Sequence, residues 1–574
     1  MYFPQLNRLK QKAVSITKFA GIDRSGRPAD GAFYDMQNLT SDGYPVLQPR
    51  NGRQVYAQTP CGGMLAKDAL CYVNDESLVI NGYAIDLGLT EGEKQLVSMG
   101  AYVVIFPDKK YINTLDYSDK GSLEAFFTST ASVAFSLCQA DGGELAKTSS
   151  PDAPEDPADG AYWLDENTGE LKQYSAPSES WVSVVSTYVK LETPGIGKDF
   201  SVGDEVTLSG IAAEALQDLN TTAVIMAKGN NFLVIPGMVT SATTQDIDQG
   251  AVKVERTVPE MDFVIESDNR LWGCRYGFDR AGKIVNELYA CKLGDFKNWQ
   301  VFQGLSTDSY RVSLGADGVF TGAFTYLGQP IFFRENCLHK VYGSYPAEYR
   351  LQTTACRGVQ QGSHKSLALV DEVLYYKASD GICAYDGSLP VCISQKLGSA
   401  RYHAAAAGSY GSKYYISMAD KNGEYHLFVY DTARRLWHRE DNLAVAHFCT
   451  RGDALYGADG ERIWVLAGAE DSTEQIHWMA KFGPLSAEDP YKRYISRIVP
   501  RLLLEPGTRV RFLVRYDGKG GWQTLGTVTG SGLRSFSLPM RTRRCDFLEL
   551  RMEGVGQGKI HSLTLVQEKG SELL

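Results

Sequence analysis

The stretch that decides the fold is Leu367-Ala-Leu-Val-Asp-Glu-Val-Leu-Tyr-Tyr376, in which two apolar runs flank the polar pair Asp371-Glu372. Two apolar runs joined by a short polar turn are typical of an antiparallel hairpin. The same arrangement recurs along the chain at 263–272, 325–333, 409–417 and 449–456. A helical repeat would need apolar residues three to four positions apart, and these segments lack that spacing.

The repeat has a regular period. The turns of four consecutive copies centre near Gly328, Glu372, Lys413 and Asp453, so successive centres are 44, 41 and 40 residues apart. A period of about 40 residues with several strands per repeat is the spacing of β-propeller blades, which stack because one blade cannot bury both faces alone. Residues 70–80 and 101–106 fit the pattern too. We therefore expect an all-β protein with a propeller of about six blades, with five or seven as alternatives.

The remaining segments suggest further domains. We expect an extended N-terminal arm over 1–60, the first propeller strands over 61–117, an inserted small β domain over 118–255, the remaining blades over 256–470 and a C-terminal β-sandwich over 471–574. The insertion carries an acidic, proline-rich stretch at 149–159, which is typical of an exposed loop. In the sandwich, Arg509, Arg511 and Arg515 alternate with apolar residues, which predicts a strand with one buried face.

Composition limits the classes of function. The chain has 574 residues, 57 Gly, 32 Tyr and a net charge of −10, and we find no apolar run long enough to span a membrane. From Lys481 onward there are 16 Lys and Arg against 9 Asp and Glu, so this segment carries +7 and the remainder −17. Opposite charges on different domains can steer one subunit onto another or onto a partner; two differently solvated domains are the alternative. The 11 cysteines form no Cys-x-x-Cys motif, which suits synthesis in a reducing cytoplasm.

Catalytic signatures are missing from the sequence. Its eight histidines form no His-Glu-x-x-His motif, and no Cys/His cluster has the spacing of a zinc site. His438 and His447 lie nine residues apart without a third ligand nearby, so ordinary strand histidines are the preferred interpretation. There is no phosphate-binding loop, no Gly-x-Ser-x-Gly elbow and no repeated Ser-x-Asp-x-Gly-x-Thr-Trp turn of the sialidase kind. We expect a protein without enzymatic activity, cofactor or metal.

Two groups of side chains are candidates for contact with partners. The densest basic cluster contains Arg541, Arg543 and Arg544, which we interpret as a subunit interface, a solvated strand edge or a contact to DNA. In the insertion, the aromatic residues Tyr162, Trp163, Tyr174 and Trp181 are candidates for glycan contact, although core packing of a small meander explains such residues at least twice as often.

Two further stretches resemble a known family. Gly21-Ile-Asp-Arg24 and Asp35-Met-Gln-Asn-Leu-Thr-Ser-Asp-Gly-Tyr-Pro-Val-Leu-Gln-Pro-Arg50 resemble the N-terminal phrase of phage tail nozzle or DNA-stabilisation proteins, which are tail tubular protein B-like β-propellers. Phe332–Gly343 and Ser379–Gly387 resemble successive blades of the same propellers. The resemblance covers Gly21 to about Leu115 and Met261 to about Gly468, and leaves out the insertion and most of the C-terminal domain.

The resemblance implies a virion protein of the tail, made in the cytoplasm of a bacterial host. Such proteins form a ring, commonly sixfold, at the end of the portal complex, and double-stranded DNA passes through its channel without sequence recognition. Portal, adaptor and other tail proteins are the implied partners, with Arg50 and Arg53 as further candidate interface residues. Two alternatives stay open: a receptor- or glycan-binding tail protein, and a propeller glycoside hydrolase.

Overall fold

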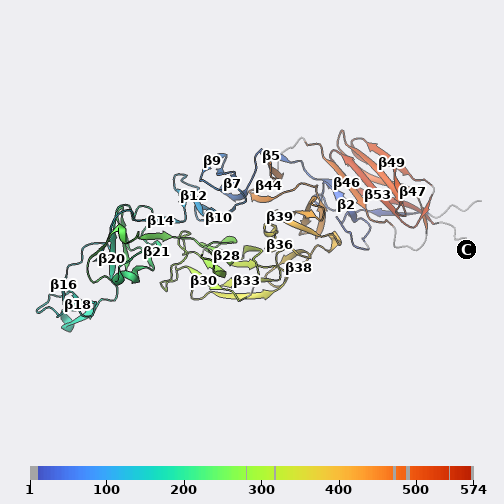
Figure 1. Cartoon of the computed structure of the whole chain (residues 1–574). Coiled ribbons are helices and arrows are strands. Elements are labelled where there is room, and N and C mark those ends of the chain that lie inside the picture. Colours follow the sequence, from blue (N-terminus) through green and yellow to red (C-terminus); the bar gives the residue numbers. More distant parts are fainter. Residues whose placement is uncertain are drawn as a thin grey trace, which may run out of the picture. The chain divides into compact units, whose positions relative to one another are not determined.

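The structure is a computed structural model that describes residues 11–26, 28–279, 281–315, 318–468, 474–485, 492–541 and 543–569. Nearly all regular structure in these residues is β-strand (Figure 1). The chain divides into two compact units: unit 1 contains residues 1–95, 318–340 and 351–574, and unit 2 contains residues 96–317 and 341–350. The expected all-β fold with propeller blades, an inserted β domain and a C-terminal sandwich is confirmed.

Seven four-stranded antiparallel sheets of the described residues have the form of propeller blades. Five are built wholly or mainly from unit 1: β6 (Gly63–Lys67), β7 (Ala69–Asn74), β8 (Ser77–Ile80) and β9 (Tyr83–Asp86); β31 (Gly322–Tyr326), β32 (Gln329–Phe333), β33 (Cys337–Tyr342) and β34 (Arg350–Ala355); β35 (Ala368–Val370), β36 (Val373–Ala378), β37 (Gly381–Tyr385) and β38 (Val391–Cys392); β39 (Tyr402–Tyr410), β40 (Lys413–Asp420), β41 (Tyr425–Asp431) and β42 (Leu436–Arg439); and β43 (His447–Arg451), β44 (Ala454–Ala458), β45 (Ile463–Ala467) and β5 (Gln54–Ala57).

Two more sheets of this form lie in unit 2. Their strands are β10 (Gln95–Met99), β11 (Tyr102–Phe106), β12 (Lys110–Asn113) and β13 (Lys120–Ser122), and β27 (Phe263–Ser267), β28 (Arg270–Phe278), β29 (Ile284–Ala290) and β30 (Tyr310–Ser313). The sheet count is therefore seven where the repeat led us to expect about six. Seven is one of the alternatives that the repeat left open.

The turn chemistry read from the sequence explains the blade hairpins. Val370 and Val373 pair directly, so Asp371 and Glu372 form a two-residue turn with φ of 48° and 64°. Positive φ at both central residues is the type I′ geometry, whose twist matches that of the flanking strands, and Asp tolerates it because its short polar side chain bonds locally. This turn sets the register that places Leu374 and Tyr376 in the blade core.

The insertion forms two sheets around one core and a separate small meander. The first two sheets contain β14 (Ala125–Thr128), β26 (Lys253–Arg256), β21 (Glu205–Ser209) and β22 (Thr222–Val224), and β23 (Ala227–Gly229), β24 (Phe232–Pro236), β20 (Tyr188–Glu192), β15 (Val133–Cys138) and β25 (Thr243–Gln245). The meander contains β16 (Lys147–Ser150), β17 (Tyr162–Asp165), β18 (Leu171–Ser175) and β19 (Ser180–Ser183), with β16 parallel to β17. The strands of the inserted sheets thus run from Ala125 to Arg256, whereas the expected bounds of the inserted domain were 118–255.

The C-terminal sandwich packs two sheets around a core that includes Phe512, Leu550 and Leu565. One sheet has the order β2 (Phe33–Gln37), β46 (His477–Phe482), β53 (Leu548–Val555), β48 (Arg509–Tyr516) and β49 (Lys519–Thr529). The other contains β1 (Gln11–Ile16), β54 (Gly558–Lys569), β47 (Arg493–Leu504), β50 (Gly532–Ser535), β51 (Leu538–Pro539) and β52 (Arg544–Cys545). Figure 1 shows the blue strand β2 beside the orange strand β46.

Over the described residues of 11–60, the segment that we expected to be an extended arm pairs with distant strands. It gives β1 and β2 to the sandwich and β5 to a blade, and between them β3 (Leu39–Thr40) pairs with β4 (Gln48–Pro49). The physical reason is that these short strands leave backbone groups unpaired unless distant strands accept them. The part of the chain that the structure describes also contains five short 3-10 helices: η1 (Ala176–Ser178), η2 (Glu214–Leu219), η3 (Ile247–Gln249), η4 (His364–Ser366) and η5 (Gln395–Leu397).

The segment from Phe19 to Arg53, which we call the strap, joins the sandwich to the blade β39–β42. The backbone N–H of Ile22 donates to the carbonyl of Trp437 over 2.6 Å, while Gly21 accepts from Phe33 over 2.8 Å. Gly21 has φ of 72°, and a Cβ at this position would overlap the Trp437 carbonyl oxygen. Only glycine meets both conditions without strain.

We predict that Gly21→Ala lowers the free energy of unfolding by about 1–3 kcal/mol, because it adds a left-handed backbone penalty to a steric overlap. Gly82→Ala is the matched control, since Gly82 has a similar φ of 82° and open space around it. Chemical denaturation of both variants separates the two contributions. Equal losses would contradict the close approach of the strap to Trp437.

Candidate functional site

A pocket of about 310 Å³ opens in unit 1 where the first strands of neighbouring blades lie side by side. Its walls come from β39, from the segment 444–446 just before β43, and from η4 beside β39. Alanine side chains form much of the wall. The polar residues that line the pocket are Glu93, His364, Lys365, Tyr425 and Asp459. We call this the alanine pocket.

An ion-pair cluster occupies one side of the alanine pocket. Glu93 Oε1 lies 3.1 Å from Lys365 Nζ and 3.3 Å from His364 Nε2. Lys365 Nζ is also 3.3 Å from Nε2 of His447. The hydrogen bond with His364 and the charge of Lys365 outweigh partial burial and lower the pKa of Glu93 to about 2. Burial, assisted by Lys365, lowers the pKa of His447 to about 4.

The second carboxylate of this pocket is held by its own loop. Asp459 accepts hydrogen bonds from the backbone of Glu461 and Arg462 and from the indole N–H of Trp464, at 2.7–3.0 Å. The cluster thus contains an ionised Glu93 carboxylate and a neutral His447 imidazole at neutral pH, both in contact with Lys365. Such a set binds hydroxyl-rich or zwitterionic ligands, but Glu93 does not supply the protonated carboxylic acid that glycoside hydrolysis requires.

The wall of the alanine pocket is strained. Ala404 has φ of 48°, and the pairing of β39 with β40 shifts register between His403 and Ala406. A non-glycine residue in the left-handed region costs about 1 kcal/mol or more, and such strain and bulges gather at binding sites. This feature independently marks the alanine pocket as a candidate site.

A carboxyl group whose pKa is raised, unlike that of Glu93, lies in unit 2. Burial, with the charge of Asp308 nearby, raises the pKa of Glu205 to about 7. Its backbone N–H donates to Asn298 Oδ1 over 2.8 Å, and the neighbouring Asp204 pairs with Arg256. These contacts fasten the inserted sheets to the loop between β29 and β30, so we assign the cluster a structural role.

Arg50 and Arg53, predicted to contact a neighbouring subunit, are used within the chain. Arg50 donates two hydrogen bonds to the Glu474 carboxylate at 3.1 and 3.2 Å. Arg53 pairs with Glu440 at 2.7 Å and with Asp441 at 2.6 Å, and each arginine side chain is only 6% exposed. Buried guanidinium groups need partners in the same fold, and these ion pairs supply them; the contact of Arg50 and Arg53 with a neighbouring subunit stays a prediction.

The basic cluster of the sandwich remains accessible. Arg541, Arg543 and Arg544 are exposed, with Arg544 in β52 and the guanidinium of Arg543 5.4 Å from the ring centre of Tyr516. Their proposed contacts with a subunit or DNA stay predictions.

The four aromatic residues of the insertion gather in its meander. Trp163 is 6% exposed and its indole N–H donates to the Ser150 carbonyl over 3.0 Å. Trp181 meets Trp163 and Tyr174 edge to face with ring centres 5.4 Å apart in both pairs. Trp163 therefore serves as the small core of the meander, whereas Tyr162, Tyr174 and Trp181 are half-buried and keep part of their rings open.

Two histidines of unit 1 are deeply buried. Nδ1 of His339 forms a hydrogen bond of 2.9 Å with Thr353 Oγ1. His438, in β42, is only 2% exposed. Burial and the charge of Arg334 lower the pKa of His339 to about 4. Burial and the charge of Lys413 lower the pKa of His438 to about 3, although Asp42 and Asp431 act in the opposite direction. Both imidazoles stay neutral in the folded chain well below pH 6.5.

We predict that stability falls as the pH falls from about 6.5 to about 4. In this window the unfolded chain binds protons at these histidines that the folded chain does not, which costs up to about 1.4 kcal/mol per pH unit for each group. Denaturant titrations at several pH values measure the slope. His438→Gln should flatten it, and an unchanged slope would contradict the burial of a neutral imidazole.

No group of three or more His, Cys, Asp and Glu suited to a metal ion was found among the residues that the structure describes. The same residues include no helix long and apolar enough to cross a membrane. Glu93, His364 and Lys365 were not among the predicted site residues, because Glu93 lies far from the other two along the chain and the three form no local motif.

Comparison with known proteins gives no family model that matches the chain and no match among curated proteins. Among solved structures, it matches an exo-β-1,3-galactanase from Phanerochaete chrysosporium at 10% identity and TM-score 0.21, over 53% of this chain and 94% of that one. An engineered family 43 glycoside hydrolase with endo-xylanase and exo-arabinofuranosidase activity matches at 9% identity and TM-score 0.19, over 54% and 96%. The Trypanosoma rangeli sialidase matches at 10% identity and TM-score 0.22, over 98% and 96%.

The expectation of a chain without enzymatic activity finds no support in these matches, which are to a galactanase, a glycoside hydrolase and a sialidase. At such TM-scores and identities they transfer no substrate and no catalytic residue to this chain.

Proposed function

We propose that this chain is a structural protein of a phage tail, of the nozzle type, whose copies form a ring around the path of the DNA. The observation that carries the proposal is that the N-terminal residues with the resemblance to nozzle proteins build the strap. Asp35 pairs with Arg24 at 3.0 Å, and Arg50 Nε donates to Asn38 Oδ1 over 2.9 Å. These strap residues hold the sandwich and the blade together, and a tail component through which DNA passes needs such rigidity.

The charge distribution supports the same proposal. The C-terminal segment from Lys481 carries +7 and the remainder −17. An acidic channel wall repels phosphate groups and lets DNA slide, whereas a basic domain attracts an acidic face of a neighbour or adaptor. Arg541, Arg543 and Arg544 are the exposed basic groups proposed for that contact.

Immunogold labelling of particles tests the location. An antibody raised against the purified chain should place gold at the tail, and prior incubation of the antibody with the chain should remove the label. Gold over the capsid, or a chain missing from purified particles by mass spectrometry, would contradict a tail protein.

Glycan binding in the alanine pocket is a second candidate function. The observation in its favour is the Glu93–Lys365 pair beside Tyr425, a set of groups that can bind neighbouring hydroxyls of a sugar. A panel of polysaccharides, assayed for both binding and cleavage, tests it with Glu93→Gln. The matched control is Glu461→Gln, since Glu461 is exposed and lies outside the residues lining the pocket. Unchanged binding or cleavage in Glu93→Gln would exclude this pocket as the sugar site.

A further inference from the structure

Two cysteines face each other across the edge of one blade. Cys383 in β37 and Cys392 in β38 are register partners, and β38 is the last strand of its sheet. The backbone N–H of Ile393 donates to the carbonyl of Ile382 over 2.8 Å, so the neighbouring pair Ile382–Ile393 is a hydrogen-bonded one. Antiparallel pairs alternate, and Cys383–Cys392 is therefore a non-hydrogen-bonded pair.

This position brings two side chains close on one face of the sheet. The Cα atoms of a non-hydrogen-bonded pair lie about 4.5 Å apart, which falls inside the range of about 4.4–6.8 Å that a disulfide spans. The two thiols can therefore join without movement of the strands. All the cysteines of the described residues are free thiols in this structure.

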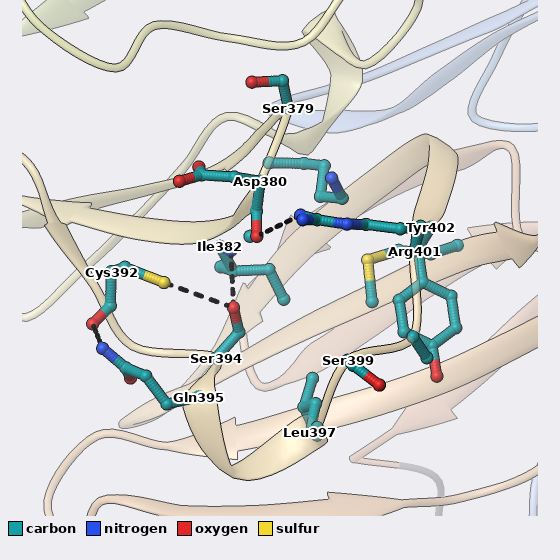
Figure 2. A pocket seen from close by; sticks show the side chains of 15 residues that line it. Ser379, Asp380, Ile382, Cys392, Ser394, Gln395, Leu397, Ser399, Arg401 and Tyr402 are labelled. Atoms are coloured by element: carbon teal, nitrogen blue, oxygen red, sulfur yellow. Dashed lines mark hydrogen bonds between the residues drawn. The ribbon is translucent and has the colours of Figure 1, made fainter.

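Cys392 has room to turn toward Cys383. Its Sγ lies 3.5 Å from Ser394 Oγ (Figure 2), and a Cβ added at Gly381 would come within 2.8 Å of the same Sγ. Gly381 and Cys383 lie two residues apart on the same face of β37, so the sulfur already sits over that face. Rotation about χ1 moves it from the space above Gly381 toward Cys383.

A small oxidant reaches one of the two thiols. Cys392 is half-buried and lines a cavity of about 250 Å³, together with Asp380, Ser394 and Arg401 (Figure 2). Cys383 is fully buried, and burial with the nearby Cys392 and Asp380 raises its pKa to about 12, although Arg357 opposes this. The accessible sulfur is thus the one that reacts first, and the buried one closes the bond.

We propose that Cys383 and Cys392 are a thiol modification site, which low-molecular-weight disulfides such as glutathione disulfide convert into a disulfide that joins β38 to β37. The Cys392 thiolate attacks glutathione disulfide, giving a mixed disulfide and one glutathione thiolate. Cys383 then loses its proton and attacks the Cys392 sulfur, which releases the second glutathione. Two protein thiols are oxidised while one glutathione disulfide is reduced to two thiols. This inference is independent of the proposed tail function.

The tryptic peptide 378–396 makes a direct test possible. Trypsin cleaves after Lys377 and Lys396, and the peptide between them holds both cysteines and no other. The full-length folded chain is incubated with glutathione disulfide, quenched in acid, unfolded, alkylated with N-ethylmaleimide and digested. We expect a peptide that has lost two hydrogen atoms, carries no alkyl group and gains two alkyl groups after reduction.

Internal and variant controls accompany the test. Cys138 and Cys274 lie on separate tryptic peptides and pair in register with Tyr188 and with Phe263 and Leu288, so both should remain alkylated. In Cys392→Ser the peptide should carry one alkyl group on Cys383 and no glutathione. A wild-type peptide that keeps two alkyl groups, or one that stops as a glutathione adduct of Cys392, would overturn the proposal.

Discussion

Replacing Arg53 by methionine should lower the free energy of unfolding by about 3–5 kcal/mol, which is the expected cost of leaving a buried charge without its partner. Arg53 contacts Glu440 and Asp441, and the Glu440 side chain is only 5% exposed. Burial alone would lower the pKa of Arg53, but the two carboxylates raise it above its ordinary value. The loss of this guanidinium leaves Glu440 with an unpaired negative charge in a buried site.

Denaturant or thermal unfolding of the purified variant measures this loss. Arg357→Ala is a suitable control, since Arg357 forms its ion pair with Asp380 at the surface, where both side chains are about half exposed. Such pairs contribute about 0–1 kcal/mol. Similar losses in the two variants would contradict the assignment of Arg53 as a buried clamp between the strap and the blade.

Replacing Trp437 by alanine should cost about 3–5 kcal/mol, as the removal of large buried aromatic side chains usually does. Trp437 is 1% exposed, and its ring centre lies 4.8 Å from that of Tyr430. Its indole N–H also donates to the Ile393 carbonyl over 3.0 Å. The variant therefore loses packing and leaves the half-buried Ile393 carbonyl without its donor.

The same variant should loosen the strap, because the backbone of Trp437 holds Ile22. Hydrogen exchange should show faster exchange at Ile22 and Phe33 than in the wild-type chain. Trp464→Ala is the control: Trp464 is half-buried in β45 and its indole bonds a loop carboxylate, so a smaller loss is expected. Unchanged exchange at Ile22 would contradict the coupling of the strap to this blade.

The blades were predictable because their information is local. The alternation around Asp371-Glu372 specifies a hairpin by itself, and the 40-residue period follows from repeating such hairpins. The alternating arginines at 509–515 likewise predicted β48 of the sandwich, where Val510, Phe512 and Val514 are buried. The period and the alternation can be read from a single sequence because each hairpin is formed by residues that are close together in the chain.

The pairing of the strap and of β5, which follows it, was not predictable for the opposite reason. β5 completes a blade through pairing with β45, about 400 residues later in the chain. Nothing in Gln54-Val-Tyr-Ala57 distinguishes a closing strand from an arm, since the partner determines its role. Arg53 and Arg50 were read as interface charges because the sequence shows their charge but not the distant Glu440 and Glu474 that neutralise it.

The alanine pocket was missed for a related reason. Glu93 and Lys365 are 272 positions apart, and the blade arrangement alone brings them together. The Cys383–Cys392 pair, in contrast, lies within one hairpin, where spacing hints at proximity but only the register determines whether the thiols face each other.

Cryo-electron microscopy of the virion tail tests the central claim most directly. The account predicts several copies of this chain arranged as a closed ring around an axial channel, with the strap between blades and sandwich resolved in each copy. Copies located away from the channel, or single copies without a ring, would contradict the nozzle proposal.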